Sequence, residues 1–225
     1  MISIIVPTLN ESGNIRRCIE GIKAEGDDSE IIVCDGGSSD NTVEVSKEYA
    51  GTIVIETSKG RGAQMNKGAE AATGDVLLFL HADTTLETGW RKSVIEALHK
   101  PQVAAGAFTL KIDNRAVLYR LIEFWVKLRC ALFNLPFGDQ GIFVRRSIFN
   151  RIGGYRDMPL MEDVEIVGRL KGEGKIVILE KCALTCARRW DRKGLIRAAL
   201  SNQLVMLMYK MGFNPDTLAK MYYGE

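Results

Sequence analysis

Along the first hundred residues, short apolar runs alternate with longer segments in which apolar residues recur every three or four positions. The short runs predict strands that are buried on both faces of a sheet. The longer segments predict amphipathic helices, as the spacing of Ile15, Ile19 and Ile22 illustrates. The strands are expected at residues 2–6, 30–34, 52–56 and 75–80, and the helices at 12–24, 42–49, 62–72 and 90–99. This order of elements is typical of an α/β protein with a parallel sheet between helices.

Beyond residue 100 the alternation is looser and the helices are longer. Strands are predicted at 103–112, 141–144 and 176–179, and helices at 115–133, 161–171 and 193–211. No internal repeat or low-complexity linker divides the chain. We therefore predict one domain over residues 1–190, with halves at 1–100 and 101–190, and a helical extension at 191–225 packed on the same domain.

The composition narrows the class of protein. The 225 residues carry a formal net charge of +2 without a dense run of one sign, which argues against a nucleic-acid partner. No apolar stretch reaches the roughly 18 residues that a membrane-spanning helix needs. The first strand follows Met1 directly, so we expect no signal peptide and a cytoplasmic location. The spacing of the five cysteines favours reduced, mostly buried thiols over a structural zinc site.

The apolar run Val76–Leu80 stops abruptly at His81-Ala82-Asp83. In open α/β sheets, ligands bind at the edge where the parallel strands end. Carboxylate and imidazole groups at that edge can both ligate a divalent cation such as Mn²⁺. We therefore predict that Asp83 is a metal ligand, with capping of the next helix as its alternative. For His81, a ligand role and a purely structural role both stay open.

Two further loops are expected at the same edge of the sheet. Pro7-Thr8-Leu9-Asn10-Glu11 follows the first strand, and Asp35-Gly36-Gly37-Ser38-Ser39-Asp40 follows the second. Ser39 or Asp40 suits the N-terminal cap of the next helix. Asp35 lies too early for that cap. We predict that its carboxylate accepts a hydrogen bond from a ligand, such as a base N–H or a ribose hydroxyl.

A glycine-rich segment, Gly60–Gly68, opens the helix predicted at 62–72. It does not match the dinucleotide fingerprint, because Met65 stands where the third glycine belongs, and it is not a Walker loop. A helix N-terminus with Lys59 and Arg61 beside it can favour a phosphate. Turn formation alone explains the glycines almost equally well.

Two charged clusters lie in the second half of the chain. Glu162-Asp163 opens a predicted helix, where the helix dipole stabilises acidic side chains. One of two neighbouring carboxylates can also act as a general base. Arg188-Arg189-Trp190 combines two cations with an aromatic ring, which suits a diphosphate or a sugar as well as a solvated surface.

Taken in order, these motifs resemble the inverting glycosyltransferases of family 2, which have the GT-A fold. The likeness extends from Ile2 to about Trp190, and Gly138-Asp139-Gln140-Gly141 within it resembles an acceptor-side loop of the family. The other matching segments are 4–11, 33–40, 60–68, 74–83 and 161–163. One departure is that His81 replaces the first Asp of the family's Asp-x-Asp motif. The variant Phe-Leu-His-Ala-Asp-Thr is similar to that of a bacterial subgroup of the family.

The resemblance implies a Rossmann-like nucleotide half, residues 1–100, fused to an acceptor half, residues 101–190, around a mostly parallel sheet flanked by helices. It also implies a hexosyltransferase-like enzyme that moves a sugar from a nucleoside-diphosphate sugar to an acceptor hydroxyl with inversion. A divalent cation, Mn²⁺ or Mg²⁺, would assist at Asp83 and His81. Asp163, the second acid of its pair, would be the general base. The biological setting would be the synthesis of a cell envelope polysaccharide or glycolipid.

The other candidate site residues form two groups, one for the nucleotide sugar and one for the acceptor. The nucleotide-sugar group is Pro7, Thr8, Glu11, Asp35, Lys59, Arg61, Ala82, Arg188 and Arg189. The acceptor-side group is Asp139, Gln140, Glu162 and Trp190. The sequence does not identify the acceptor, and a lipid-linked acceptor is among the candidates.

Two other functions stay open. A phosphohydrolase of the haloacid dehalogenase type also places Asp-x-Asp-x-Thr after a buried strand, but His81 cannot form the aspartyl phosphate that its chemistry needs. A non-catalytic nucleotide-sugar-binding protein would fit the loss of the first Asp. The amphipathic helices at 115–133 and 193–211 have three interpretations, namely packing on the sheet, a homodimer seam, or peripheral contact with the inner face of a membrane. Packing is the interpretation we favour.

Overall fold

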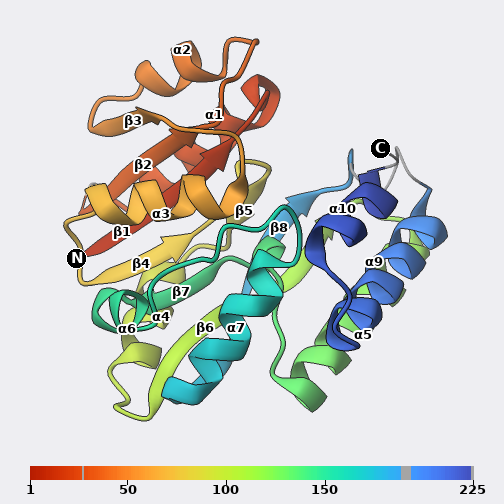
Figure 1. The fold of residues 1–225 in the computed structure, drawn as a ribbon. Helices are drawn as coiled ribbons and strands as arrows, with labels where there is room; N and C mark the ends of the chain where they lie inside the picture. The colour runs from red at the N-terminus through yellow and green to blue at the C-terminus, as the bar shows by residue number, and fades with distance from the viewer. Residues whose placement is uncertain (27, 189–193, 224–225) are drawn as a thin grey trace.

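The computed structural model describes residues 1–26, 28–188 and 194–223, and in 195–200 the backbone only. One eight-stranded sheet, in the order β3-β2-β1-β4-β7-β6-β8-β5, extends through both halves of the chain (Figure 1). Its strands are β1 (Ile2–Thr8), β2 (Ser29–Asp35), β3 (Thr52–Glu56), β4 (Val76–Phe79), β5 (Thr84–Leu86), β6 (Val103–Asp113), β7 (Ile142–Arg145) and β8 (Lys175–Cys186).

Helices cover this sheet as the amphipathic patterns predict. They are α1 (Ser12–Lys23), α2 (Thr42–Lys47), α3 (Arg61–Ala71), α4 (Trp90–Leu98), α5 (Val117–Phe133), α6 (Arg146–Arg151), α7 (Glu162–Glu173), α9 (Leu195–Lys210), α10 (Pro215–Tyr223) and the 3-10 turn η1 (Gly138–Gln140). The structure adds β5 and α10, which the pattern did not predict, and β8 is longer than expected. β5 has only three residues, two of them Thr, so it lacks the apolar run by which buried strands are found.

The α/β class predicted from the sequence is confirmed, and the sheet is mixed. In the first half, β1 pairs in parallel with both β2 and β4, and β2 pairs in parallel with β3. In the second half, β6 pairs in parallel with β8, whereas β7 runs antiparallel to both β4 and β6, and β5 runs antiparallel to β8. Parallel pairs are therefore the majority in the sheet as a whole, and all antiparallel pairs involve β7 or β5.

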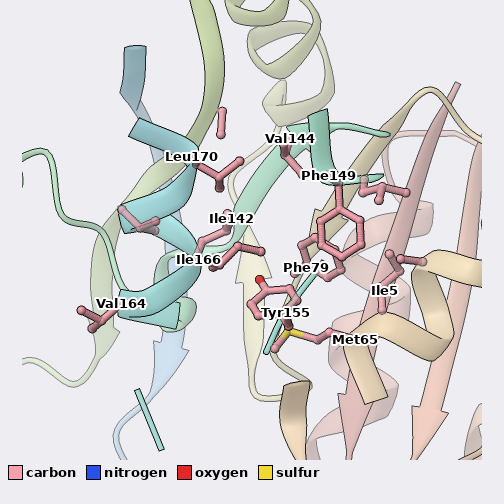
Figure 2. Packing of buried hydrophobic residues seen from close by; sticks show 14 of the residues in the cluster. Ile5, Met65, Phe79, Ile142, Val144, Phe149, Tyr155, Val164, Ile166 and Leu170 are labelled. Atoms are coloured by element: carbon pink, nitrogen blue, oxygen red, sulfur yellow. The ribbon is translucent and has the colours of Figure 1, made fainter. Parts of the chain in front are cut away.

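Each face of the sheet has its own apolar core, because successive side chains of a strand point to opposite faces. In β1, Ile5 packs in the core under α3, α6 and α7, whereas Ile4 and Val6 pack in the core under α1 and α4. Figure 2 shows the first of these cores, in which Tyr155 stands edge-on to Phe79 with ring centroids 5.0 Å apart. Burial on both faces explains why the strands read as continuous apolar runs.

A smaller core joins α5 to the end of β6 and contains Leu110, Tyr119 and Ile122. Figure 1 shows α5, α9 and α10 grouped together on the side of the molecule opposite α1 and α2. Within the described part of the chain, no helix is both long and apolar enough to cross a membrane. All five cysteines are free thiols, and only Cys186 is not fully buried.

Glycines in α3, near its start and near its end, permit close packing of the helix on its neighbours. A Cβ atom added at Gly68 would lie 2.4 Å from Cγ2 of Ile5 and 2.8 Å from Sγ of Cys34. At Gly62 an added Cβ would lie 2.8 Å from the carbonyl oxygen of Arg156. These glycines let α3 approach β1, β2 and the loop before α7, which explains them without a phosphate.

We predict that Gly68→Ala destabilises the protein by about 1–3 kcal/mol, because the core has no room for a methyl group there. Gly168→Ala is the matched control, since Gly168 lies within α7 with nothing within 4 Å of an added Cβ. There the helix should gain about 0.5–1 kcal/mol from the better helix former. Denaturant unfolding measures both changes. Equal effects at the two positions would contradict the close packing.

Candidate active site

The loops that follow β1 and β2 are joined to each other by hydrogen bonds. The backbone N–H of Asn10 donates to Oγ of Ser38, and the side-chain oxygen of Asn10 accepts from the N–H of Ser39, both at 2.8 Å. One turn further on, Ser12 N–H donates to the carboxylate of Asp40 at 3.1 Å. Asp40 also accepts from the N–H of Thr42, the first residue of α2, although Asn41, and not the predicted Ser39 or Asp40, is the N-cap residue of that helix. The two loops therefore form one surface at the edge of the sheet.

Asp35 lies under this surface and is only 2% exposed. Its Oδ1 accepts from the hydroxyls of Thr8 and Ser38, and its Oδ2 accepts from the N–H groups of Gly37 and Ser38. Four donors match the acceptor capacity of a carboxylate. In this structure Asp35 therefore holds its own loop, and a ligand would have to share or replace one of these bonds.

Gln64 was not identified from the sequence, although it organises the same edge. Its Nε2 donates to the carbonyl oxygens of Thr8 and Cys34, both at 2.7 Å, so the side chain bridges the ends of β1 and β2. Asn66 acts similarly on the other side of α3, where its amide exchanges two 2.8 Å hydrogen bonds with the backbone of Tyr155. A signal for Gln64 exists in the sequence, because it is a polar residue on the buried side of a helix, next to Met65.

The turn after β4 presents the variant motif. Thr84 N–H donates to the carbonyl oxygen of His81 at 3.1 Å, which closes a turn around Ala82 and Asp83. Ala82 is buried, whereas His81 and Asp83 are both partly exposed. The chain then enters β5, and Gly89 lies at the start of α4. Capping of α4 is therefore not the role of Asp83.

Asp83 lies near an ion pair that joins two distant parts of the chain. Nη2 of Arg188 donates to both carboxylate oxygens of Glu11, at 2.7 and 2.8 Å. Burial lowers the pKa of Arg188, but the carboxylates of Glu11 and Asp83 more than offset this effect and raise it overall. The structure thus brings together Glu11, Asp83 and Arg188, which were predicted to bind the nucleotide sugar or the metal. Glu11 and Arg188 form an ion pair with each other.

His81 and Asp163 meet on either side of Gly138. A Cβ atom added at Gly138 would lie 3.0 Å from Nε2 of His81 and 3.6 Å from Cβ of Asp163. The N–H of Gly138 donates to Oδ2 of Asp163 at 2.8 Å, which fixes the carboxylate. This meeting follows from the antiparallel pairing of Phe79 with Ile142, because it brings the start of β7 to the end of β4.

The other acid of the pair, Glu162, is 3% exposed and bound to Arg61, with Nε of Arg61 3.0 Å from Oε1 of Glu162. The Glu162 carboxylate raises the pKa of Arg61, and Asp163 adds to this effect. Burial, together with the charges of Asp163 and Glu162, also raises the pKa of Tyr155 well above its usual value. Arg61 is therefore directed to the acid pair in this structure.

The acceptor-side loop is supported by Gln140, which is 1% exposed. Its Nε2 donates to the carbonyl oxygen of Phe108, and its Oε1 accepts from Arg129 and from the N–H of Phe137. This amide holds the loop in place. Asp139, the neighbouring residue, lines a groove between α5 and α9.

The remaining predicted site residues are dispersed. Pro7 is buried at the end of β1, and Lys59 is exposed just before α3. Arg189 and Trp190 lie outside the described residues. No three His, Cys, Asp or Glu side chains form a metal-binding group in the part of the chain that the structure describes. His81 and Asp83 could supply two protein ligands, which suits a cation whose other ligands are phosphate oxygens and water.

Comparison with known sequences gives a consistent family. The model of the family described as glycosyl transferase family 2 matches residues 3–156. A PGL/p-HBAD biosynthesis glycosyltransferase of Mycobacterium bovis is 32% identical over 169 residues, which cover 69% of this chain and 63% of that protein. The glycosyltransferase AglE of Haloferax volcanii is 28% identical over 98 residues, covering 40% of this chain and 32% of its own. The chain thus spans less than two thirds of the length of these relatives.

Solved structures share the fold at low sequence identity. The mannosyltransferase PcManGT from Pyrobaculum calidifontis, in complex with GDP-Man and Mn²⁺, has a TM-score of 0.72 and 18% identity, covering 99% of this chain and 68% of its own. S. aureus TarS 1–349, in complex with UDP-GlcNAc, has a TM-score of 0.66 and 17% identity, covering 82% of this chain and 58% of its own. The GT-A architecture implied by the sequence motifs is therefore confirmed.

The joined loops after β1 and β2 give a pH-dependent prediction. Hydrogen bonds from Thr42 and then Ser12 lower the pKa of Asp40 to about 2. Because the pKa of an unfolded Asp is about 3.9, the charged carboxylate stabilises the fold above that pH, and the contribution is lost as the pH falls through about 2. Asp40→Asn should therefore be less stable than the wild type at pH 7, with a gap that shrinks below about pH 4.

Denaturant unfolding of both proteins between pH 7 and pH 3 measures this gap. A gap that stays constant over the range would mean that the charge of Asp40 does not stabilise the two loops.

Proposed function

The chain belongs to glycosyltransferase family 2, and from that premise we propose that it transfers a sugar from a nucleoside-diphosphate sugar to an acceptor hydroxyl with inversion at the anomeric carbon. The observation that carries the proposal is the meeting of His81, Gly138 and Asp163 at the end of β4. The carboxylate of Asp163 thus lies near the turn that also carries Asp83, which supports a base next to a phosphate-binding edge.

Asp163 is the general base in this proposal. The acceptor oxygen bonds to the anomeric carbon while the bond from that carbon to the diphosphate oxygen breaks. The hydroxyl proton passes to Asp163, and the nucleoside diphosphate leaves. The N–H of Gly138 orients the carboxylate. Glu162 is bound to Arg61, so the two adjacent acids have different roles.

Asp83, with His81 in the same turn, would hold a divalent cation together with phosphate oxygens of the donor. Such a cation, when bound, neutralises charge on the departing diphosphate. Arg188 adds a fixed positive charge close to Asp83, and exposed Lys59 lies near the start of α3. The first-strand and second-strand loops, with Thr8, Glu11 and Asp35, would hold the base and ribose. The nucleotide-sugar complexes of the two structural neighbours support this assignment.

We predict that Asp163→Asn lowers kcat by about 10²-fold to 10⁴-fold, because the amide cannot accept the acceptor proton. The affinity for the nucleoside diphosphate should be nearly unchanged, since Asp163 does not contact it in this proposal. Asp157→Asn is a matched control, because it removes an exposed carboxylate from the loop before α7. Transfer from radiolabelled donors measures both variants. Near-normal turnover of Asp163→Asn would exclude its role as base.

We also predict that nucleoside diphosphates stabilise the protein in the presence of Mn²⁺. At a ligand concentration about 100 times Kd, the gain of about 2.7 kcal/mol should raise Tm by roughly 5–10 °C. Asp83→Asn should abolish the Mn²⁺-dependent part of this shift. Asp75→Asn, at the opposite end of β4, should leave it intact. A thermal-shift panel of nucleoside diphosphates with and without Mn²⁺ measures the effect, and an unchanged shift in Asp83→Asn would remove Asp83 from the metal site.

A further inference from the structure

A groove of about 560 Å³ lies between α5 and α9, outside the nucleotide-binding edge of the sheet. Its walls are mainly apolar and include Trp125, Leu128, Leu132, Phe137, Met206 and Leu207. This volume lies within the range of pockets that hold small ligands, roughly 300–1,000 Å³. A groove of this kind suits a flexible apolar chain.

The groove lies close in the chain to the loop that contacts the proposed general base. Phe137 and Asp139 line the groove, and Gly138 between them donates its N–H to Asp163. A ligand with its apolar part between α5 and α9 can therefore extend a polar part toward Asp163. The groove therefore lies next to the loop that binds Asp163.

Two cations, Arg129 and Lys210, line the groove beside its apolar walls. Arg129 is buried, with its guanidinium carbon 3.5 Å from the centroid of Phe137, and its hydrogen bonds go to Leu135 and Gln140. Lys210 lines the groove, and burial together with Lys210 lowers the pKa of Lys171. The lining thus contains two positive side chains, Arg129 and Lys210, and the negative side chain of Asp139. Its net positive charge favours an anionic ligand.

The outer surface of the same helices is also apolar. Large exposed side chains on α5 and α9 include Leu118, Leu121, Phe124 and Leu204, and exposed Met211 follows α9 directly. Exposed Arg120 and Lys127 lie on α5 beside these residues. Contiguous exposed apolar surface marks an interaction site.

We propose that the groove between α5 and α9 binds the hydrocarbon chain of an amphipathic acceptor that carries a phosphate. The cations at the groove attract the phosphate, and the apolar walls hold the chain. The reacting hydroxyl of the acceptor is then directed to Asp163. This last step rests on the proposed function, whereas binding of the chain does not.

The test uses decyl phosphate, below its critical micelle concentration, as the probe, with the full chain and without any sugar donor. Leu207→Glu places a carboxylate on the groove wall and should weaken binding about tenfold or more, because the charge must be desolvated. Leu204→Glu is the matched control. Both leucines are on α9 and are 55% and 54% exposed, but only Leu207 lines the groove. Binding to the control should stay within about twofold of the wild type.

Isothermal titration calorimetry measures the affinities, and thermal melting checks that each variant is folded. Lys210→Glu should weaken the binding of decyl phosphate and leave the binding of decyl maltoside nearly unchanged. This comparison separates the contribution of the phosphate to the affinity from that of the hydrocarbon chain. Equal losses in Leu207→Glu and Leu204→Glu would overturn the groove in favour of non-specific adsorption on the helices. No binding to the wild type, with a dimer seen by sedimentation that Leu207→Glu dissociates, would assign the groove to a second copy of the chain.

The result is distinguishable from a failure of the proposed function. Probe binding needs neither donor nor Asp163, so a groove that binds decyl phosphate stands even if Asp163→Asn remains active. Conversely, if Asp163→Asn is inactive and decyl phosphate does not bind, the proposed transferase activity is kept and the proposed binding of a hydrocarbon chain in the groove is wrong.

Discussion

β4 is hydrogen-bonded on both edges, in parallel to β1 and antiparallel to β7. The parallel pairing brings the end of β4 to the edge where the loops after β1 and β2 lie. The antiparallel pairing brings the start of β7, and therefore Gly138 in η1, to the same place. One strand thus joins the edge that we propose for the nucleotide to the loop that we propose for the acceptor side. The positions of His81, Asp83 and Asp163 depend on this change of strand direction.

The supporting contacts around the site are mostly made by buried amides and glycines. Gln64 bridges the ends of β1 and β2, Asn66 holds the loop before α7, and Gln140 holds η1. Gly68 allows α3 to lie close to β1 and β2, which Gln64 bridges, and Gly62 allows it to lie close to the loop that Asn66 holds. Buried amides that satisfy backbone groups in this way fix loop positions, since leaving those groups unpaired costs free energy. The site is therefore a property of the packed scaffold rather than of its charged residues alone.

The side of the molecule formed by α5, α9 and α10 differs from the rest in exposing large apolar residues. Packing of these helices on the sheet, the interpretation favoured from the sequence, accounts for their buried faces, such as Tyr119 and Ile122 on α5. It does not account for the outer apolar residues or for the groove. A helix with both a packed face and an exposed apolar face suits a protein that handles a partly apolar ligand. This feature distinguishes the second half of the chain from the first half, where α1 to α4 cover the sheet.

The sequence by itself determined the α/β class, the order of the main elements and the family, because buried parallel strands and amphipathic helices leave local periodic patterns. It also placed Asp35, Asp83 and Asp163 at the ends of elements, since a strand end or a helix start is a local feature. It did not reveal β5, the antiparallel direction of β7, or the bridging role of Gln64. Only the tertiary structure decided that Glu11 pairs with Arg188, that Arg61 is bound to Glu162, and that Gly138 lies between His81 and Asp163. These contacts join residues far apart in the chain, and their partners are fixed by strand direction and packing, which leave no periodic signal in the sequence.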